Sequence, residues 1–167
     1  MDKRLADAIN VQLNFEIESA YVYLAILGYV QTLGLDGFEN WFNVQYQEEL
    51  THAKKFIDYL AERGERVEIT GFETPRNEYT SILEALEVSL AHEKEVTRRI
   101  NNLMTIAIEV KDYATMSFLN WYIDEQVEEE DNFNKLIDKV KLLDGKGLYM
   151  LDKDLAARVF VDETQAE

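Results

Sequence analysis

Long stretches free of helix-breaking residues constrain this chain more than any other feature. Only seven glycines and one proline interrupt its 167 residues, and between them the apolar side chains recur with a period of about 3.6 residues. This pattern predicts an all-α protein. The length suits a single domain, residues 1–167, which can bury a sizeable core without covalent cross-links.

Four long apolar stripes and a short one predict five helices. Short turns join the first helix to the second and the third to the fourth, so each pair should be antiparallel. Between the pairs, Glu65–Thr80 lacks periodicity. Extended, these roughly 16 residues reach about 50 Å, enough to travel the roughly 40 Å length of a helix, so the second and third helices should be parallel. The expected spans are about 3–32, 38–63, 81–110, 112–144 and 152–162, in a four-helix bundle with a long crossover.

Polar residues at the expected helix starts match capping signals. Ser81 and Glu84 form a capping box, and Asp112 suits an N-cap. Asp36 and Glu39 resemble a capping pair that opens the second helix. These signals support the boundaries drawn from periodicity.

The short C-terminal helix is expected to have Asp152 as its cap. The four long helices, at about residues 3–144, already cover one another's apolar faces, so little apolar surface of the bundle remains for the apolar side of this short helix to cover. Two destinations stay open for that side: its own bundle or another subunit.

Acidic side chains interrupt the apolar stripe of every long helix. They lie about 11 to 16 residues from the expected helix starts, so the predicted topology brings all of them to one level of the bundle. An unpaired carboxylate in a dry core is costly, and two divalent cations bridged by one carboxylate would neutralise the group. The acids are Glu16, Glu49, Glu93 and Glu129.

The sequence Glu49-x-x-His52 places a carboxylate and an imidazole side by side on one helix face. The fourth helix offers Gln126-x-x-Glu129, which predicts an asymmetric two-metal site. Because the chain has no cysteine, only oxygen and imidazole ligands are available. This donor set suits iron or manganese and tolerates zinc; iron is expected, since two adjacent redox metals can give an oxidant two electrons at once.

Further polar residues surround this face. Four flanking acids are interpreted either as a solvated rim or as ligands of a third, weaker cation: Glu48, Glu125, Glu128 and Glu130. Tyr23 packs in the core, hydrogen-bonds a ligand or passes an electron to the metals. His92 points about 100° away from the inward face and is expected to be exposed.

Charge and hydropathy restrict the partners. With 33 acids against 17 bases the net charge is -16, which disfavours nucleic acid and anionic membranes and favours cations. The N-terminus lacks the apolar core of a signal peptide, and no run is long enough to span a membrane. A cytoplasmic protein is expected, although the acid excess alone is also typical of a protein that is merely soluble.

The chain resembles the non-haem bacterial and archaeal ferritins over nearly its full length. The resemblance implies a ferritin-like bundle that oxidises Fe(II) with O2 or H2O2 at a di-iron ferroxidase centre. It also implies a homo-oligomer, a hollow shell of 24 subunits that stores ferric mineral. The matching segments are Asn14–Glu16, Gln47–His52, His92–Glu93, Trp121–Glu130 and Gly147–Lys153.

The same resemblance implies ligands for two irons. One iron would be held by Glu16, Glu49 and His52. Its neighbour would be held by the bridging Glu49 together with Glu93 and Glu129.

Other residues match the family's pattern around the two irons. Gln126 would stand beside the ligands, and Tyr23 beside the first iron. A third iron would be held by Glu48, Glu125 and Glu128 together with Glu129.

Three alternatives fit less well or belong to another class. Haem-containing bacterioferritins have a methionine where this chain has Leu50 and a second complete Glu-x-x-His, so no haem is expected. A rubrerythrin-like di-iron peroxidase or oxidase shares the bundle, but usually shows two such motifs and often a cysteine-bound iron. The third alternative is an acidic helical scaffold whose carboxylates face solvent.

Overall fold

The computed structural model describes residues 1–143, 147–162 and 164, and within them every regular element is a helix. The all-α prediction is confirmed, and the four long helices begin and end within about two residues of their expected positions. The helices are α1 (Lys3–Gln31), α2 (Asp36–Glu62), α3 (Ile82–Glu109), α4 (Tyr113–Leu143) and α5 (Leu148–Leu155).

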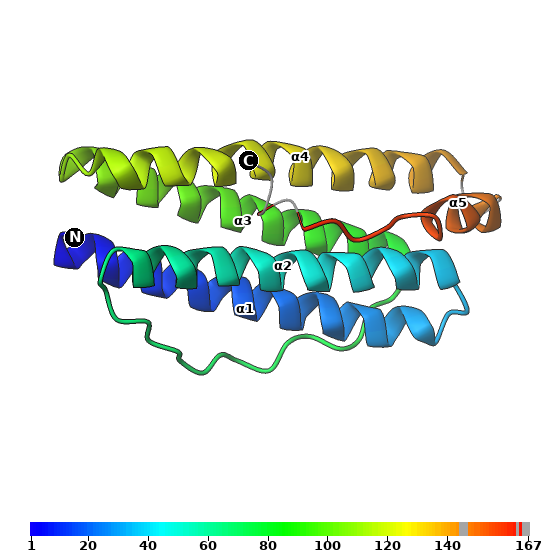
Figure 1. Ribbon diagram of the computed structural model, residues 1–167. Coiled ribbons are helices and arrows are strands. Elements are labelled where there is room, and N and C mark those ends of the chain that lie inside the picture. Colours follow the sequence, from blue (N-terminus) through cyan, green and yellow to red (C-terminus); the bar gives the residue numbers. More distant parts are fainter. Residues whose placement is uncertain (144–146, 163, 165–167) are drawn as a thin grey trace.

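The long helices form a four-helix bundle with the predicted connectivity (Figure 1). α1 and α2 are antiparallel, as are α3 and α4. The chain after α2 runs back along the outside of the bundle before α3 begins, so α2 and α3 are parallel (Figure 1). None of the described helices is both long and apolar enough to cross a membrane.

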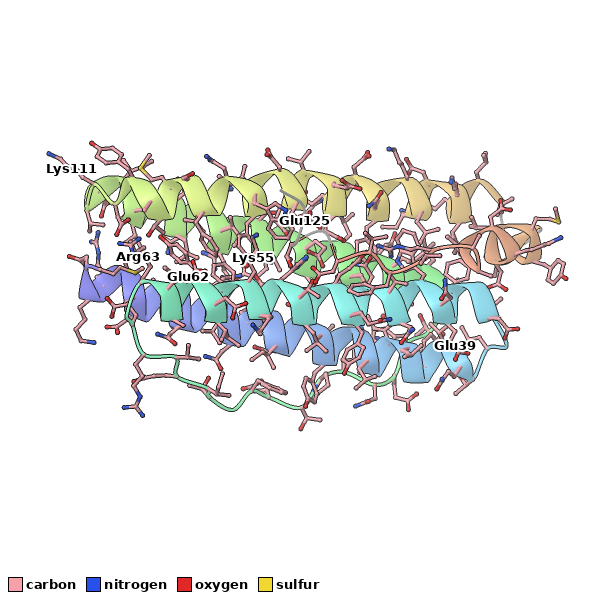
Figure 2. All side chains as sticks on the ribbon, in the orientation of Figure 1. Glu39, Lys55, Glu62, Arg63, Lys111 and Glu125 are labelled. Atoms are coloured by element: carbon pink, nitrogen blue, oxygen red, sulfur yellow. The ribbon has the colours of Figure 1, made fainter. Side chains whose placement is uncertain are left out.

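Two of the predicted caps are confirmed. The hydroxyl of Ser81 accepts a hydrogen bond from the backbone N–H of Glu84 at 3.1 Å, and Asp112 accepts one from Thr115 at 3.0 Å. Arg63, at the end of α2 beside the α3–α4 turn (Figure 2), also binds both carboxylate oxygens of Asp112, at 3.0 and 2.8 Å. This guanidinium lowers the pKa of Asp112 to about 2, and the pair ties the two halves of the bundle together.

The predicted caps of α2 and α5 are wrong. The N-cap of α2 is Leu35, whose side chain cannot accept a hydrogen bond. The carboxylate of Asp152 accepts from the N–H groups of Gly37 and Phe38 instead, at 2.9 and 3.0 Å. Asp152 therefore caps α2 from the interior of α5, because a tertiary contact replaces the local one.

The bounds of α5 also differ from the expected 152–162. The helix begins at Leu148, directly after Gly147, whose φ of +84° suits glycine. Leu151 is buried against the end of the bundle, whereas Tyr149 and Met150 are 74% and 62% exposed. Of the two destinations left open, α5 takes its own bundle and leaves two large side chains uncovered.

The apolar core is divided into two clusters, one toward each end of the bundle. Phe42 and Phe133 belong to the cluster near α5. Phe56 and Tyr122 belong to the other cluster, where their rings stack with centroids 4.1 Å apart. Apart from Thr115 near the start of α4, the buried polar residues of the long helices lie where the two clusters meet. This polar layer consists of Gln12, Glu16, Ser19, Gln45, Glu49, His52, Ser89, Glu93, Gln126 and Glu129.

Candidate metal centre

Each of the four long helices contributes an acid to the polar layer. Glu16 comes from α1, Glu49 from α2, Glu93 from α3 and Glu129 from α4, and none is more than 3% exposed. The expectation that these acids converge in the bundle interior is confirmed. The alternative of a scaffold whose carboxylates face solvent is wrong.

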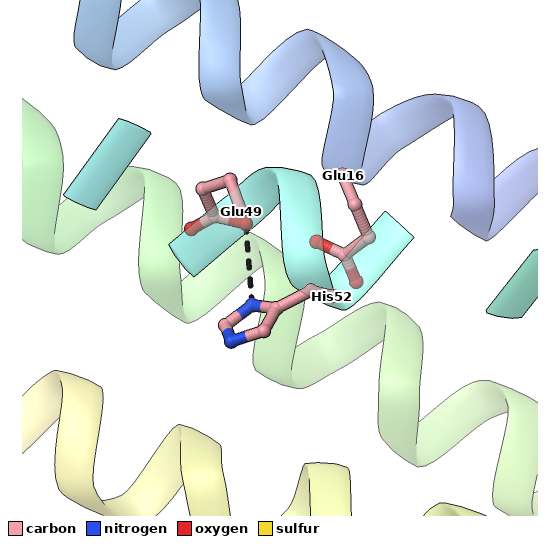
Figure 3. Close-up of side chains that lie close together, drawn as sticks. All are labelled: Glu16, Glu49 and His52. Atoms are coloured by element: carbon pink, nitrogen blue, oxygen red, sulfur yellow. Dashed lines mark ion pairs between the residues drawn. The ribbon is translucent and has the colours of Figure 1, made fainter. Parts of the chain in front are cut away.

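Glu16, Glu49 and His52 form the most compact group. One ligand atom from each lies within 4.8 Å of the others, with His52 Nδ1 3.4 Å from Glu49 Oε2. Figure 3 shows Glu16 reaching from α1 toward the turn of α2 that carries the other two. In the described part of the chain this is the only group of three or more histidine, aspartate or glutamate side chains that lie close enough together to share an ion.

Two carboxylate oxygens in this group have no hydrogen-bond partner among the described residues. They are Glu16 Oε2 and Glu49 Oε2, and both are buried. Buried polar atoms in native proteins are nearly always paired, so unpaired oxygens need an explanation. Glu49 Oε2 has only its 3.4 Å ion-pair contact with His52 Nδ1. Two carboxylate oxygens without a hydrogen bond, beside an imidazole, are the donors that a divalent cation would take, so these residues fit a metal ion.

Glu93 is held by two hydrogen bonds from neighbouring helices. Tyr23 donates its hydroxyl proton to Glu93 Oε1, and Gln126 Nε2 donates to Glu93 Oε2 at 3.1 Å. The resemblance had implied that Tyr23 stands beside the first metal, near Glu16. In the structure its hydroxyl contacts Glu93, the ligand expected for the second.

Two glutamines position acids in a way that sequence reasoning missed. Gln12 Nε2 donates to Glu16 Oε1, and Gln45 Nε2 donates to Glu129 Oε2, both at 2.8 Å. Their signal in the sequence is position: Gln45 lies on the inward stripe of its helix, and Gln12 precedes Glu16 by one turn. Glu93 and Glu129 thus share the buried layer with the compact group, each oriented by an amide.

Burial changes the proton affinity of the whole layer. It raises the pKa of Glu16, raises that of Glu49 well above its usual range, and raises that of Glu93 to about 7 and of Glu129 to about 8. For His52, burial lowers the pKa, but the carboxylates of Glu125 and Glu49 outweigh it and raise the pKa well above 6.5. Without a cation, the layer holds protons instead.

The three acids expected at a further cation site differ in their surroundings. Glu125 lies between α4 and α2 (Figure 2), with Oε1 3.6 Å from His52 Nε2. Glu48 binds Arg158 of the C-terminal segment. Glu128 is exposed.

The expectation that His92 is exposed is wrong. Helix α1 covers this side of α3, and His92 Nε2 lies 2.7 Å from the hydroxyl of Ser19. Its ring also stacks on Phe15, with centroids 5.0 Å apart. The side chain is half-buried, and this burial lowers the pKa of His92 to about 4, so the ring is neutral and serves packing.

The metal-free protein is expected to lose stability as the pH rises from about 5 to about 8. The raised pKa values of Glu93 and Glu129, about 7 and about 8 against 4.5, mean that the folded state keeps protons that the unfolded state releases. Their stabilising effect is complete below 4.5 and is lost as the pH passes through the folded values. Thermal unfolding of chelator-treated protein measures this, and excess Zn²⁺ should remove the dependence. A flat or rising profile without metal would contradict it.

Comparison with known proteins gives consistent matches. Residues 6–143 match the ferritin-like domain. A bacterial non-heme ferritin from Staphylococcus haemolyticus is 44% identical over 165 residues, covering 98% of this chain and 99% of its own. One from Staphylococcus aureus is 42% identical with the same coverage.

Solved structures agree with these matches. A closed form of the Archaeoglobus fulgidus ferritin, engineered by site-directed mutagenesis, superposes with a TM-score of 0.94 at 44% identity. It covers 96% of this chain and 99% of its own. An open-pore ferritin from the same archaeon gives 0.93 at 44% identity, with 95% and 98% covered.

Proposed function

This chain belongs to the ferritin family, and on that premise we propose that it is an iron-storage ferritin: it oxidises Fe(II) to Fe(III) within each bundle and stores the ferric product inside a hollow shell. The observation that carries the proposal is the pair of buried oxygens on Glu16 and Glu49 beside His52, neither of which has a hydrogen-bond partner among the described residues. Ferrous iron is the substrate that these donors suit.

The residues have distinct tasks in this proposal. Glu16, Glu49 and His52 bind one ferrous ion, and Glu49 also serves a second ion with Glu93 and Glu129. Each of the two ferrous ions gives up one electron, and the two electrons together with two protons reduce O2 to H2O2 or H2O2 to two waters. Because the carboxyls hold protons in the metal-free protein, iron binding releases those protons to solvent.

The partners of these ligands keep the site in shape. Tyr23 and Gln126 fix the two oxygens of Glu93 from α1 and α4, and Gln45 fixes Glu129. Ligands oriented in this way lose little freedom when an ion binds. A third iron at Glu48, Glu125 and Glu128, with Glu129, is part of the proposal.

Assembly into a homo-oligomer of 24 subunits in the cytoplasm completes the proposed function. The relatives are named as ferritins, and large apolar side chains stay exposed on the single bundle. Such exposure is typical of surfaces that are covered on association. The charge of -16 supports Fe(II) as the cargo and argues against nucleic acid or membrane partners.

Purified protein is expected to run as a particle of about 470 kDa and to show a hollow sphere by electron microscopy. After aerobic addition of Fe(II) well beyond three ions per subunit, iron should co-elute with that particle and appear as an electron-dense core. Protein that elutes as a small oligomer with no retained iron would contradict storage.

The rubrerythrin-like alternative predicts a different result. A soluble di-iron peroxidase or oxidase would turn over with peroxide as a small oligomer and accumulate no mineral. Light scattering and iron retention therefore separate the two functions in one preparation.

A further inference from the structure

The chain after α5 turns back along the bundle and docks on α2. In Figure 1 this segment runs from α5 toward the middle of the bundle, beside α2. The side-chain amide of Asn40, on α2, donates to the carbonyls of Leu155 and Arg158, at 3.1 and 2.8 Å. These bonds fix the backbone of the segment at the point where Arg158 leaves it.

The guanidinium of Arg158 meets three groups of α2. It binds both oxygens of Glu48, at 3.0 and 2.8 Å, and donates to Gln45 Oε1 at 2.6 Å. Its Cζ atom lies 4.1 Å from the ring centre of Trp41. The Arg158 and Glu48 side chains are 20% and 17% exposed, so the pair sits at the edge of the polar layer, within reach of solvent ions.

Gln45 connects this pair to the buried centre. Its amide oxygen accepts from Arg158, and its amide nitrogen donates to Glu129 Oε2 at 2.8 Å. An amide has one end that accepts and one that donates. The contact with Arg158 therefore fixes which end faces Glu129.

We propose that Arg158 is a tethered cation that occupies Glu48 whenever no metal ion is bound there, and that it positions Glu129 through Gln45. The proposal rests on the proposed function, because it concerns the third metal site that the proposed function places at Glu48. The guanidinium already occupies both oxygens of Glu48, at 3.0 and 2.8 Å. A metal ion that binds these oxygens must displace it, since the ion and the guanidinium are both positively charged and would repel each other there. When Arg158 leaves, Gln45 loses the contact that fixes its orientation, so its amide is free to turn and holds Glu129 less firmly.

Zn²⁺ titration by calorimetry tests this without any redox step. The parent should show tight sites, absent from a Glu49→Ala, His52→Ala variant, and a weaker class absent from Glu48→Gln. In Arg158→Gln the weaker class of sites should bind Zn²⁺ about tenfold more tightly, because the guanidinium no longer competes for Glu48. The gain is no larger because the Arg158–Glu48 pair is partly exposed to solvent, which limits the strength of that contact. Arg158→Lys, which keeps the charge, should stay near the parent.

Arg98→Gln is the matched control. Arg98 is exposed and pairs only with Glu95 on its own helix among the described residues, so its loss removes the same charge elsewhere. Equal affinity of the weaker class in the parent and Arg158→Gln would overturn the proposal. Absence of the tight class in the parent would instead count against the proposed function, so the two failures are distinguishable.

Fluorescence of Trp41 gives a second readout that a purely structural arginine would not move. In a Trp121→Phe background, filling the weaker class with Zn²⁺ should change Trp41 emission, since the stacked guanidinium departs. Arg158→Gln in that background should show no such step. If Zn²⁺ fills the weaker class in Trp121→Phe protein that keeps Arg158, and Trp41 emission stays unchanged, then Arg158 does not leave and the proposal is wrong.

Discussion

A Glu49→Ala, His52→Ala variant is expected to oxidise Fe(II) more than about 100-fold more slowly than the parent. Changing residues that merely orient metal ligands already costs roughly 10- to 100-fold, and this variant removes two ligands, one of which serves both ions. Stopped-flow absorbance of ferric iron, measured at two Fe(II) per subunit with air-saturated buffer, gives the rates.

The matched control changes the same helix without touching the polar layer. Lys54 and Asp58 form an exposed ion pair on α2, and the Lys54→Ala, Asp58→Ala variant should keep the parent rate. Oxidation at the parent rate in the Glu49→Ala, His52→Ala variant would show that the centre lies elsewhere. Circular dichroism checks that both variants keep the helical fold.

A Gly37→Ala variant is expected to be destabilised by about 3 kcal/mol, the cost of overpacking combined with a lost helix cap. A Cβ at Gly37 would lie 1.6 Å from the backbone carbonyl oxygen of Asp152. Backbone cannot rotate away, so α5 must shift and the cap that Asp152 gives to α2 is lost. Denaturant-induced unfolding at fixed protein concentration measures the change.

Gly28→Ala is the control for this variant. Gly28 lies inside α1, and nothing approaches within 4 Å of a Cβ built there. Alanine at this position should stabilise the protein by about 0.5 to 1 kcal/mol, because it restricts the unfolded chain and favours the helix. If Gly37→Ala were as stable as Gly28→Ala, the close packing of α5 on α2 would not exist in solution.

The helices and the acidic layer were predictable because both follow from local periodicity. Glu93 shares a stripe with Leu86 and Ile100, so a regular helix must turn all three to the same side. The crossover was predictable from its length alone, since the segment is long enough to travel the bundle. Residue spacing thus specified which side chains point inward and at what height.

The contacts of those side chains were not predictable in the same way. The inward position of Gln45 was visible, but its two partners come from α4 and from a segment 113 residues later. His92 was expected to face solvent because its own helix turns it away from the bundle axis. Helix α1 covers it nonetheless.

By itself the sequence determined that the chain forms a bundle of long helices and that four acids meet in its interior. Only the tertiary structure decided which polar atoms pair there: Asp152 caps α2, 115 residues away, and Arg158 reaches Glu48. The physical reason is that periodicity reports the geometry of one helix, whereas a contact between distant residues depends on how helices dock. Docking is set by the shape and volume of all the side chains between them.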